Sequence, residues 1–214
     1  MSATIVAARS EDAVIVAAAA LQRDEVVAIP TETVYGLAVL PRAGPLARLL
    51  DVKRRATDKG IQLLIDSIDQ ARSVAVLSPA AEQLADAFWP GGLTLIVDRR
   101  PDVDLPLLLG GGRPTLGLRL PDHDLPRALA RLLGPLAASS ANLSGRPPAT
   151  TAELVAAALG DELGMIVDDG PVRGGVPSTV VDCSAAADDP RILREGAVPA
   201  AEIHRLLGRD YTLD

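Results

Sequence analysis

The stretch EVVAIPTETVYGLAV at residues 25–39 decides the fold class of this chain. Residues 25–30 form a short apolar run that ends at Pro30, which is typical of a buried strand. Residues 31–39 are interpreted as a turn that carries two threonine hydroxyls, a carboxylate and a phenol directly after the strand. Because ligands of α/β sheets bind where strands end, the stretch predicts an α/β protein with a site at this point. The alternative is a plain turn in which the threonine side chains bond their own backbone.

Short apolar runs alternate with helical patterns on both sides of this stretch, which predicts a sheet flanked by helices. Strand runs lie close together around residues 93–97 and 115–120 and again around 165–195, which favours a mixed sheet over a parallel one. No linker or repeat interrupts the pattern, so residues 1–214 are expected to form a single domain. The expected helices cover residues 10–23, 45–53, 78–89, 125–133, 150–159 and 199–207, and the other expected strands cover residues 61–65, 93–97, 114–121, 135–139, 165–169, 178–183 and 191–195.

Two of these helices carry defined start signals. Ser78 followed by Pro79 pairs a helix N-cap with a proline at the first helical position. Thr150 and Glu153 have the spacing of a capping box, in which each side chain bonds a backbone N–H of the other residue. Both helices are therefore expected to begin at these residues.

Charge and the scarcity of aromatic residues exclude several functions. The formal net charge is −7, from 21 Lys and Arg against 28 Asp and Glu, which argues against broad binding to nucleic-acid phosphates. One Trp, two Tyr and one Phe are too few for the stacking platforms of a single-strand binder. The single cysteine, Cys183, excludes an internal disulfide, and no long apolar segment or secretory signal is present. A cytoplasmic protein without membrane attachment is expected, and the sequence indicates no oligomeric state.

Several familiar catalytic signatures are absent from the sequence. It contains no GxxxxGK[ST], GxGxxG, GxSxG or HExxH motif. A P-loop ATPase, a dinucleotide-dependent oxidoreductase and a serine hydrolase therefore lose their main support.

Three further segments concentrate polar side chains at the ends of apolar runs. KRRATDKG at residues 53–60 places four cations together, as a phosphate site or as a solvated helix end. SSANLSG at 139–145 offers compact donors and acceptors, as a ligand loop or as turn chemistry. STVVD at 178–182, with Arg194 in the next strand run, is a third site segment or a plain edge strand. Together they predict a pocket that stabilises charge on a phosphate-bearing substrate.

A fourth segment, LGGGRPT at residues 109–115, contains three consecutive glycines. Consecutive glycines raise the conformational freedom of the backbone. The segment is therefore expected to be either an exposed hairpin tip or a mobile lid over the pocket.

The order and spacing of eight elements between about Val26 and Gly196 resemble the Sua5/YciO/YrdC family. These elements are PTETVYGL, Lys53-Arg54-Arg55, DKG at 58–60, FWPGGLTLIV, GLRLPDH, SSANLSG, STVVD and ILREG. The resemblance implies a twisted mixed sheet with flanking helices and a concave, positively lined central cavity. It also implies synthesis of L-threonylcarbamoyladenylate and pyrophosphate from L-threonine, bicarbonate and ATP. A separate transferase complex then uses the product to make t6A at adenosine 37 of tRNA, so tRNA and that complex are the implied partners.

Site residues follow from matching the family's motifs position by position. The residues implied to bind ATP are Lys53, Arg55, Lys59, Thr115, Ser140, Asn142 and Arg194. Those implied to be catalytic, from the KxR and SxN elements, are Lys53, Arg55, Ser140 and Asn142. The residues matching threonine-associated positions are Thr31, Arg119 and Ser178. Mg²⁺ is expected to bind through the phosphates of ATP, without a protein side chain as ligand.

The chain departs from the common family pattern at four positions. Ala56 and Gly60 stand where many members have proline, although some bacterial members have glycine at the second position. Leu64 stands where some longer members have a histidine near threonine, and Ser139 replaces a commoner threonine. The chain ends shortly after Gly196, so the C-terminal second domain of longer members is not expected.

Three alternatives to the synthase remain open, and the departures at Ala56 and Leu64 bear on the first of them. One is a YciO-like paralogue that keeps the fold and the ATP pocket but not the activity. Another is an RNA-binding module that uses a local basic cavity. A third is the carbamoyltransferase chemistry of a hydrogenase-maturation protein, whose additional acylphosphatase and zinc-finger segments this chain lacks.

Overall fold

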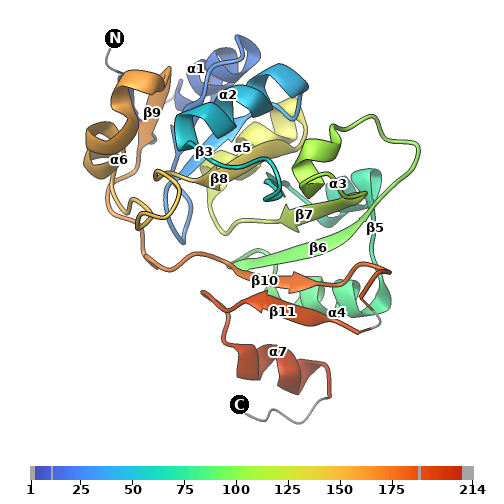
Figure 1. Ribbon diagram of the computed structural model, residues 1–214. Coiled ribbons are helices and arrows are strands. Elements are labelled where there is room, and N and C mark those ends of the chain that lie inside the picture. The colour runs from blue at the N-terminus through green and yellow to red at the C-terminus, as the bar shows by residue number, and fades with distance from the viewer. Residues whose placement is uncertain (1–2, 11, 188, 209–214) are drawn as a thin grey trace.

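The computed structural model describes residues 3–10, 12–187 and 189–208 and consists of one large twisted sheet with helices on both faces (Figure 1). The strands are β1 (Thr4–Ala7), β2 (Val27–Ile29), β3 (Gly36–Val39), β4 (Gln62–Leu64), β5 (Ala75–Val76), β6 (Leu93–Arg99), β7 (Thr115–Arg119), β8 (Leu136–Ser140), β9 (Met165–Asp168), β10 (Thr179–Asp182) and β11 (Arg191–Arg194). The helices are α1 (Ala13–Gln22), α2 (Ala43–Lys53), α3 (Ile68–Val74), α4 (Pro79–Phe88), α5 (Asp124–Leu133), α6 (Ala152–Leu159) and α7 (Ala200–Leu206), with 3₁₀ turns η1 (Leu107–Gly110) and η2 (Gly160–Glu162).

The strand order in the sheet is β1-β9-β2-β3-β8-β4-β7-β6-β10-β11, with β5 paired to β6. Strands β1, β9 and β2 pair in parallel, as do β4 with β7 and β6 with β10. The remaining pairs, including β2 with β3 and β3 with β8, are antiparallel. The predicted mixed α/β sheet is therefore confirmed. Its order places strands far apart in sequence side by side, so residues of segments 53–60, 139–145 and 178–182 border one cavity.

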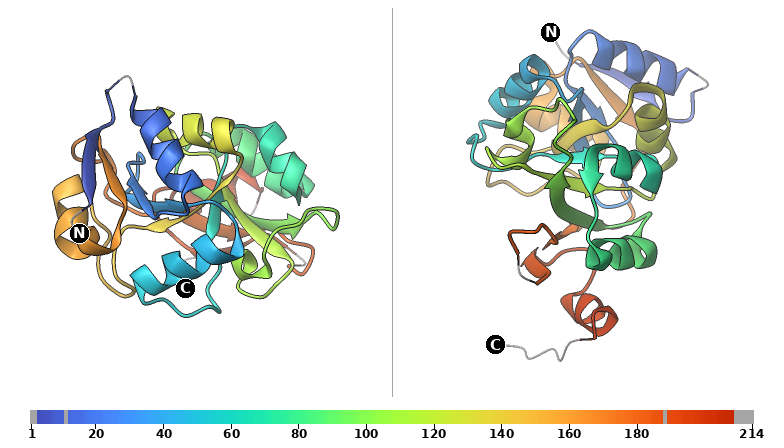
Figure 2. Two further views of the ribbon diagram at one scale, coloured as in Figure 1. Left: turned by 90° about the horizontal axis from the view of Figure 1, so that it is seen from above. Right: turned by 90° about the vertical axis from the view of Figure 1, so that its right-hand side faces the viewer.

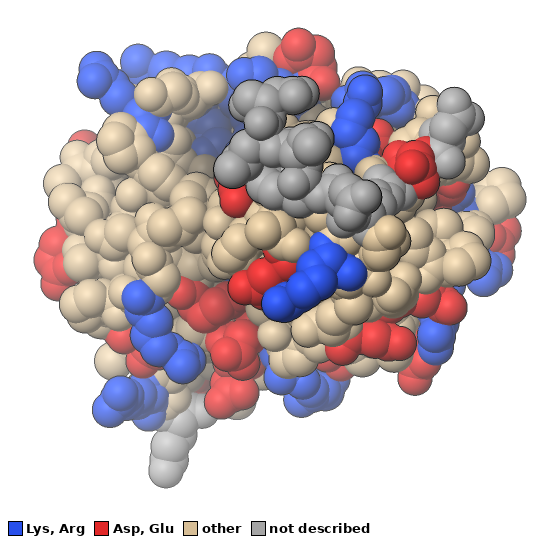
Figure 3. Space-filling view, turned by 90° about the horizontal axis from the view of Figure 1, so that it is seen from below, with Lys and Arg blue, Asp and Glu red and all other residues tan. Residues whose placement is uncertain are grey.

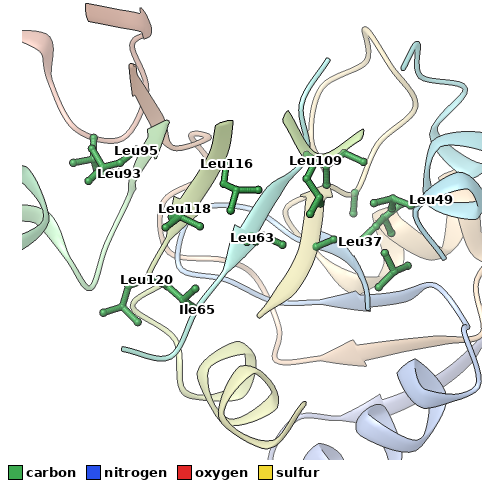
Figure 4. Close-up of a cluster of buried hydrophobic side chains, with 14 of the residues drawn as sticks. Leu37, Leu49, Leu63, Ile65, Leu93, Leu95, Leu109, Leu116, Leu118 and Leu120 are labelled. Atoms are coloured by element: carbon green, nitrogen blue, oxygen red, sulfur yellow. The ribbon is translucent and has the colours of Figure 1, made fainter. Parts of the chain in front are cut away.

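Side chains of the central strands alternate between two apolar cores. In β2, Val27 and Ile29 pack with α1 and α5, whereas Ala28 packs with the cluster on the opposite face. Figure 2, seen from above, shows α1 and α5 together on one side of the sheet and α2 on the other. The cluster that contains Ala28 is rich in leucines from α2, η1 and the central strands. Among them are Leu37, Leu49, Leu63, Leu109, Leu116 and Leu118 (Figure 4).

Most predicted elements are present, and the differences are local. Residues 31–39 are not all turn: Gly36–Val39 is strand β3, fully buried between β2 and β8. A strand of four residues next to threonine and glycine resembles a turn in sequence, and only its pairing partners define it. Helix α3 and strands β1 and β5 were not expected. Position 11, within the predicted first helix, lies outside the described residues.

The two helix-start predictions differ in outcome. Ser78 caps α4 as predicted, because its hydroxyl accepts a hydrogen bond from the Ala81 amide at 3.3 Å. The cap of α6 was predicted one residue early. Thr151, not Thr150, has the extended backbone of an N-cap, and its hydroxyl accepts from the Leu154 amide at 3.3 Å. Adjacent threonines are equivalent in sequence, and the backbone conformation selects one of them.

The described part of the chain contains no helix that is long and apolar enough to cross a membrane.

Candidate active site

A cavity of about 440 Å³ opens over strands β4, β6, β7, β8 and β10, and residues from all five strands line it. Seven of the ten predicted site residues line it: Arg55, Thr115, Arg119, Ser140, Asn142, Ser178 and Arg194. Lys53, Lys59 and Thr31 are not among its lining residues. The structure thus brings most of the predicted site to one cavity and places these three residues behind or beside it.

Arg55 enters the cavity because helix α2 ends in a left-handed turn. Arg54 takes φ 48° and ψ 47°, and the Arg55 amide donates back to the Leu50 carbonyl at 3.0 Å. This closes the helix and redirects the chain. The Arg55 guanidinium donates to Ser139 Oγ at 3.1 Å and to the Gly60 carbonyl at 2.7 Å, and its buried Nε has no partner among the described residues.

Lys53 points inward, beneath the loop that follows β8. Its side chain is 2% exposed, and Nζ donates to the backbone carbonyl oxygens of Ser140 and Asn142, the latter at 2.8 Å. Burial, and then the charge of Arg55, lower the pKa of Lys53 to about 8. In this structure Lys53 positions the loop that carries Ser140 and Asn142.

The Asn142 side chain is likewise used within the loop. Its amide nitrogen donates to the carbonyls of Leu143 at 2.8 Å and Arg146 at 2.6 Å, and Oδ1 lies 3.5 Å from Lys53 Nζ. These bonds hold the turn that leads from β8 toward α6. Ser140 stays at the cavity wall, at the end of β8.

The PTET segment forms the support of Arg119. Thr31 Oγ1 donates to the Val34 carbonyl at 2.6 Å and accepts from the amides of Thr33 and Val34. For this threonine the structure therefore shows the alternative of a turn in which the side chain bonds its own backbone. Arg119 donates to the Glu32 carboxylate at 2.7 Å, to Thr33 Oγ1 at 2.8 Å and to the Gly91 carbonyl at 3.1 Å. The Arg119 side chain is 3% exposed, and these three bonds hold its guanidinium in one orientation beside the cavity.

Hydroxyl and amide side chains from three strands form a hydrogen-bonded floor. Thr94 Oγ1 lies 2.8 Å from both Gln62 Oε1 and Ser178 Oγ, and Arg194 donates to the Ser178 carbonyl at 2.7 Å. Gly117 on β7 lies between Gln62 and Thr94 and leaves this floor open. Gln62 and Thr94 were missed by sequence reasoning. The only signal was a polar side chain within an apolar strand run.

The cavity is cationic although the chain is acidic. Five arginines line it, namely Arg55, Arg113, Arg119, Arg146 and Arg194, and no Asp or Glu is found among the described lining residues. Burial and then the charge of Arg194 lower the pKa of Arg55, and burial and then the charge of Arg119 lower that of Arg194. Like charges that converge on one space make it a site for an anion. Arg113 and Arg146 were not predicted as site residues.

One outer face of the molecule carries mixed charges. On the face seen from below, blue and red side chains are interspersed, without a single broad basic field (Figure 3). The five arginines of the cavity, by contrast, lie without an Asp or Glu among its described lining residues, which suits a small anionic ligand.

The glycine-rich segment packs against the cavity wall. The Ile61 amide donates to the Leu109 carbonyl at 2.8 Å, and Leu109 is buried in the core. Gly111, at φ 64°, brings its backbone against the Asp58 carbonyl so closely that a Cβ would collide with it. Of the two expectations for residues 109–115, an exposed hairpin tip is contradicted for the part up to Gly111.

Comparisons with known proteins show the family to which the chain belongs. The Sua5/YciO/YrdC family, described as "Telomere recombination", matches residues 19–196. The threonylcarbamoyl-AMP synthase of Bacillus subtilis (strain 168) is 43% identical over 195 residues, 90% of this chain and 56% of that protein. The threonylcarbamoyl-AMP synthase of Vibrio parahaemolyticus is 34% identical over 182 residues, 83% of this chain and 95% of that protein.

A solved structure is also similar. The crystal structure of P. abyssi Sua5 complexed with L-threonine has a TM-score of 0.89 and 35% identity, covering 98% of this chain and 62% of that one. The chain thus spans little more than half of the Bacillus relative and nearly all of the Vibrio relative. On the family match and these identities, the chain is a member of the Sua5/YciO/YrdC family.

Proposed function

We propose that this chain is a threonylcarbamoyl-AMP synthase, an enzyme of the nucleotidyltransferase class. The observation that carries the proposal is the cavity that five arginines line, with no Asp or Glu among its described lining residues, and that the family's KxR and SxN segments reach. The names of the relatives and the L-threonine complex of the P. abyssi protein support the same reaction. We propose further that the chain acts as one domain.

The proposed reaction joins three substrates. The amine of L-threonine attacks bicarbonate, and a C–N bond forms as water leaves, which gives a carbamate. A carbamate oxygen then attacks the α-phosphorus of ATP, and the bond to the β-phosphate oxygen breaks. The products are threonylcarbamoyl-AMP and pyrophosphate. Because the carbamate decomposes in water, the enzyme must hold it in line with the phosphorus and stabilise the developing charge.

Individual residues are assigned from their position in the cavity. Arg119, fixed by Glu32, binds the carboxylate of threonine, and Ser178 accepts from its ammonium or hydroxyl group. Arg55 and Arg194 bind phosphate oxygens, and Ser140 donates to the same nucleotide.

The remaining predicted residues have supporting places around the cavity, and two of them, Asn142 and Thr115, line it. Lys53 and Asn142 position the loop that follows β8, and Thr31 holds the turn that supports Arg119. Thr115 at the start of β7 lines the cavity, whereas Lys59 lies on the loop beside it.

Magnesium enters this reaction with ATP as part of the substrate. The described residues contain no group of three or more His, Cys, Asp or Glu side chains that could hold a metal ion. Mg²⁺ bound to nucleotide phosphates keeps several waters and needs few protein ligands. We further propose that the product passes to the transferase that forms t6A37 in tRNA, which places the reaction in the cytoplasm.

The test is mass spectrometry of the purified protein with ATP, Mg²⁺, L-threonine and bicarbonate, each omitted in turn. Threonylcarbamoyl-AMP should form only when the three reactants are present together. ATP binding without product would contradict the synthase and favour the paralogue. If the protein neither binds ATP nor forms the product, the assignment of the cavity as the ATP site is contradicted. Measuring RNA affinity at increasing salt concentration separates the synthase from the RNA-binding module. The affinity of an RNA-binding module for RNA would fall steeply as salt increases.

A further inference from the structure

The positive charge available for the terminal phosphates of ATP cannot come from Lys53 in the observed structure, because its Nζ is bonded to loop carbonyls. Arg119 is paired with Glu32. Arg55 and Arg194 already use part of their donors on Ser139, Gly60 and the Ser178 carbonyl, so a triphosphate needs further partners.

Two arginines outside the predicted site have their donors available. Arg113 makes a single long bond, from Nε to the Gly110 carbonyl at 3.4 Å. The Arg146 guanidinium has no hydrogen bond or ion pair to any described residue. Both side chains line the cavity. Both residues are exposed, so each guanidinium lies at the opening.

The backbone places these two arginines on either side of Arg55. The loop at 53–60 is bonded to both of its neighbours: the Ser144 amide donates to the Lys53 carbonyl at 3.0 Å, and the Ile61 amide donates to the Leu109 carbonyl at 2.8 Å. Arg146 follows Ser144 on one flanking loop, and Arg113 follows Leu109 on the other. The three arginines therefore lie on three adjoining segments, and all three line the same cavity.

We propose that Arg113 and Arg146, with Arg55 between them, form a subsite for the β- and γ-phosphates of ATP and for the departing pyrophosphate. This subsite rests on the proposed function for its place in the reaction. Guanidinium groups suit it because each can donate two parallel hydrogen bonds to one phosphate. As the bond to the α-phosphorus breaks, negative charge develops on pyrophosphate, and the rim stabilises that charge.

Calorimetry with three probes tests the subsite: inorganic pyrophosphate, ATP and AMP, each added with Mg²⁺ to wild type, R113A, R146A and the double variant. We expect each single substitution to weaken pyrophosphate and ATP binding about tenfold, or about 1.4 kcal/mol, and the double substitution to weaken them more. AMP binding should stay unchanged, because AMP lacks the two terminal phosphates. R113K/R146K should recover part of the affinity, and R48A, an exposed arginine of α2, should bind as wild type does.

Two results would overturn the subsite. One is unchanged pyrophosphate affinity in the double variant. The other is an equal loss of AMP and pyrophosphate affinity, because the two arginines would then act on the whole cavity. The wild-type synthesis assay separates this question from the proposed function. If wild type makes no threonylcarbamoyl-AMP, the proposed synthase function is wrong. The effect of the substitutions on pyrophosphate binding relative to AMP binding still shows whether the subsite exists.

Discussion

Arg119 donates to Glu32 across a 2.7 Å ion pair in which the two side chains are 3% and 14% exposed. The pair connects the end of β7 to the PTET turn after β2, segments nearly ninety residues apart in sequence. It explains why a carboxylate stands beside a proposed anion site: Glu32 fixes the guanidinium without lining the cavity itself.

Replacing Glu32 by alanine should therefore affect both stability and threonine use. A buried charge left without its partner costs about 3 kcal/mol of unfolding free energy. The KM for threonine should rise at least about tenfold as Arg119 loses its orientation. Urea unfolding and threonine titration of the synthesis rate measure the two effects. Glu32→Gln keeps an acceptor oxygen and should recover much of both. Equal stability of wild type and Glu32→Ala would show that the pair does not hold Arg119.

Lys53 should make stability depend on alkaline pH. Its pKa is lowered by burial from 10.5 in the unfolded chain to about 8 in the folded chain. Between these values the unfolded state binds more protons, so the free energy of unfolding contributed by Lys53 rises with pH. Below pH 8 the buried charge is a constant cost. The free energy of unfolding of wild type and of Lys53→Met can be measured with urea from pH 7 to 10. Above pH 8 the value for wild type should rise relative to that of the variant. A difference that stays flat would mean that Lys53 titrates normally.

Arg55→Ala should lose most of the synthesis activity with little change in melting temperature. The guanidinium bonds Ser139 and Gly60, which contributes about 1 kcal/mol to stability and a few degrees of Tm. Its proposed contact with phosphate is worth more, and we expect kcat to fall about 100-fold. Kinetics and thermal unfolding, with Arg48→Ala as the matched exposed variant, distinguish the two contributions. A collapsed melting temperature would make Arg55 structural and contradict its assignment.

Gly111 and Gly112 provide a matched pair that tests the contact between the loops. Both have positive φ, 64° and 84°, so alanine at either position introduces backbone strain of about 1–2 kcal/mol. Only at Gly111 does a Cβ collide with the Asp58 carbonyl, whereas the space beside Gly112 is open. Gly111→Ala should cost about 2 kcal/mol more in urea unfolding and should weaken ATP binding. Equal effects of the two substitutions would show that the two loops are not held together here.

Much of the fold could be predicted because each strand run is short, apolar and bounded by turn residues. The runs at 93–97 and 135–139 are strands β6 and β8, and Ser78 caps α4 as its position before Pro79 indicated. Strand β3 was misinterpreted because four buried residues between threonines and a loop carry too weak a pattern. The cap of α6 was misplaced by one residue for a similar reason: two threonines stand side by side, and only the backbone distinguishes them.

The sequence by itself determined the family, the α/β class and the segments that reach the cavity, because these depend on local patterning and on the order of motifs along the chain. Only the tertiary structure decided which side chains face that cavity. Lys53 and Arg55 are two residues apart, yet one is bonded beneath the loop and the other lines the site, because the left-handed Arg54 breaks the helical geometry between them. Arg113 and Arg146 line the same cavity because the sheet order places β4 between β8 and β7, a neighbourhood that no local pattern encodes.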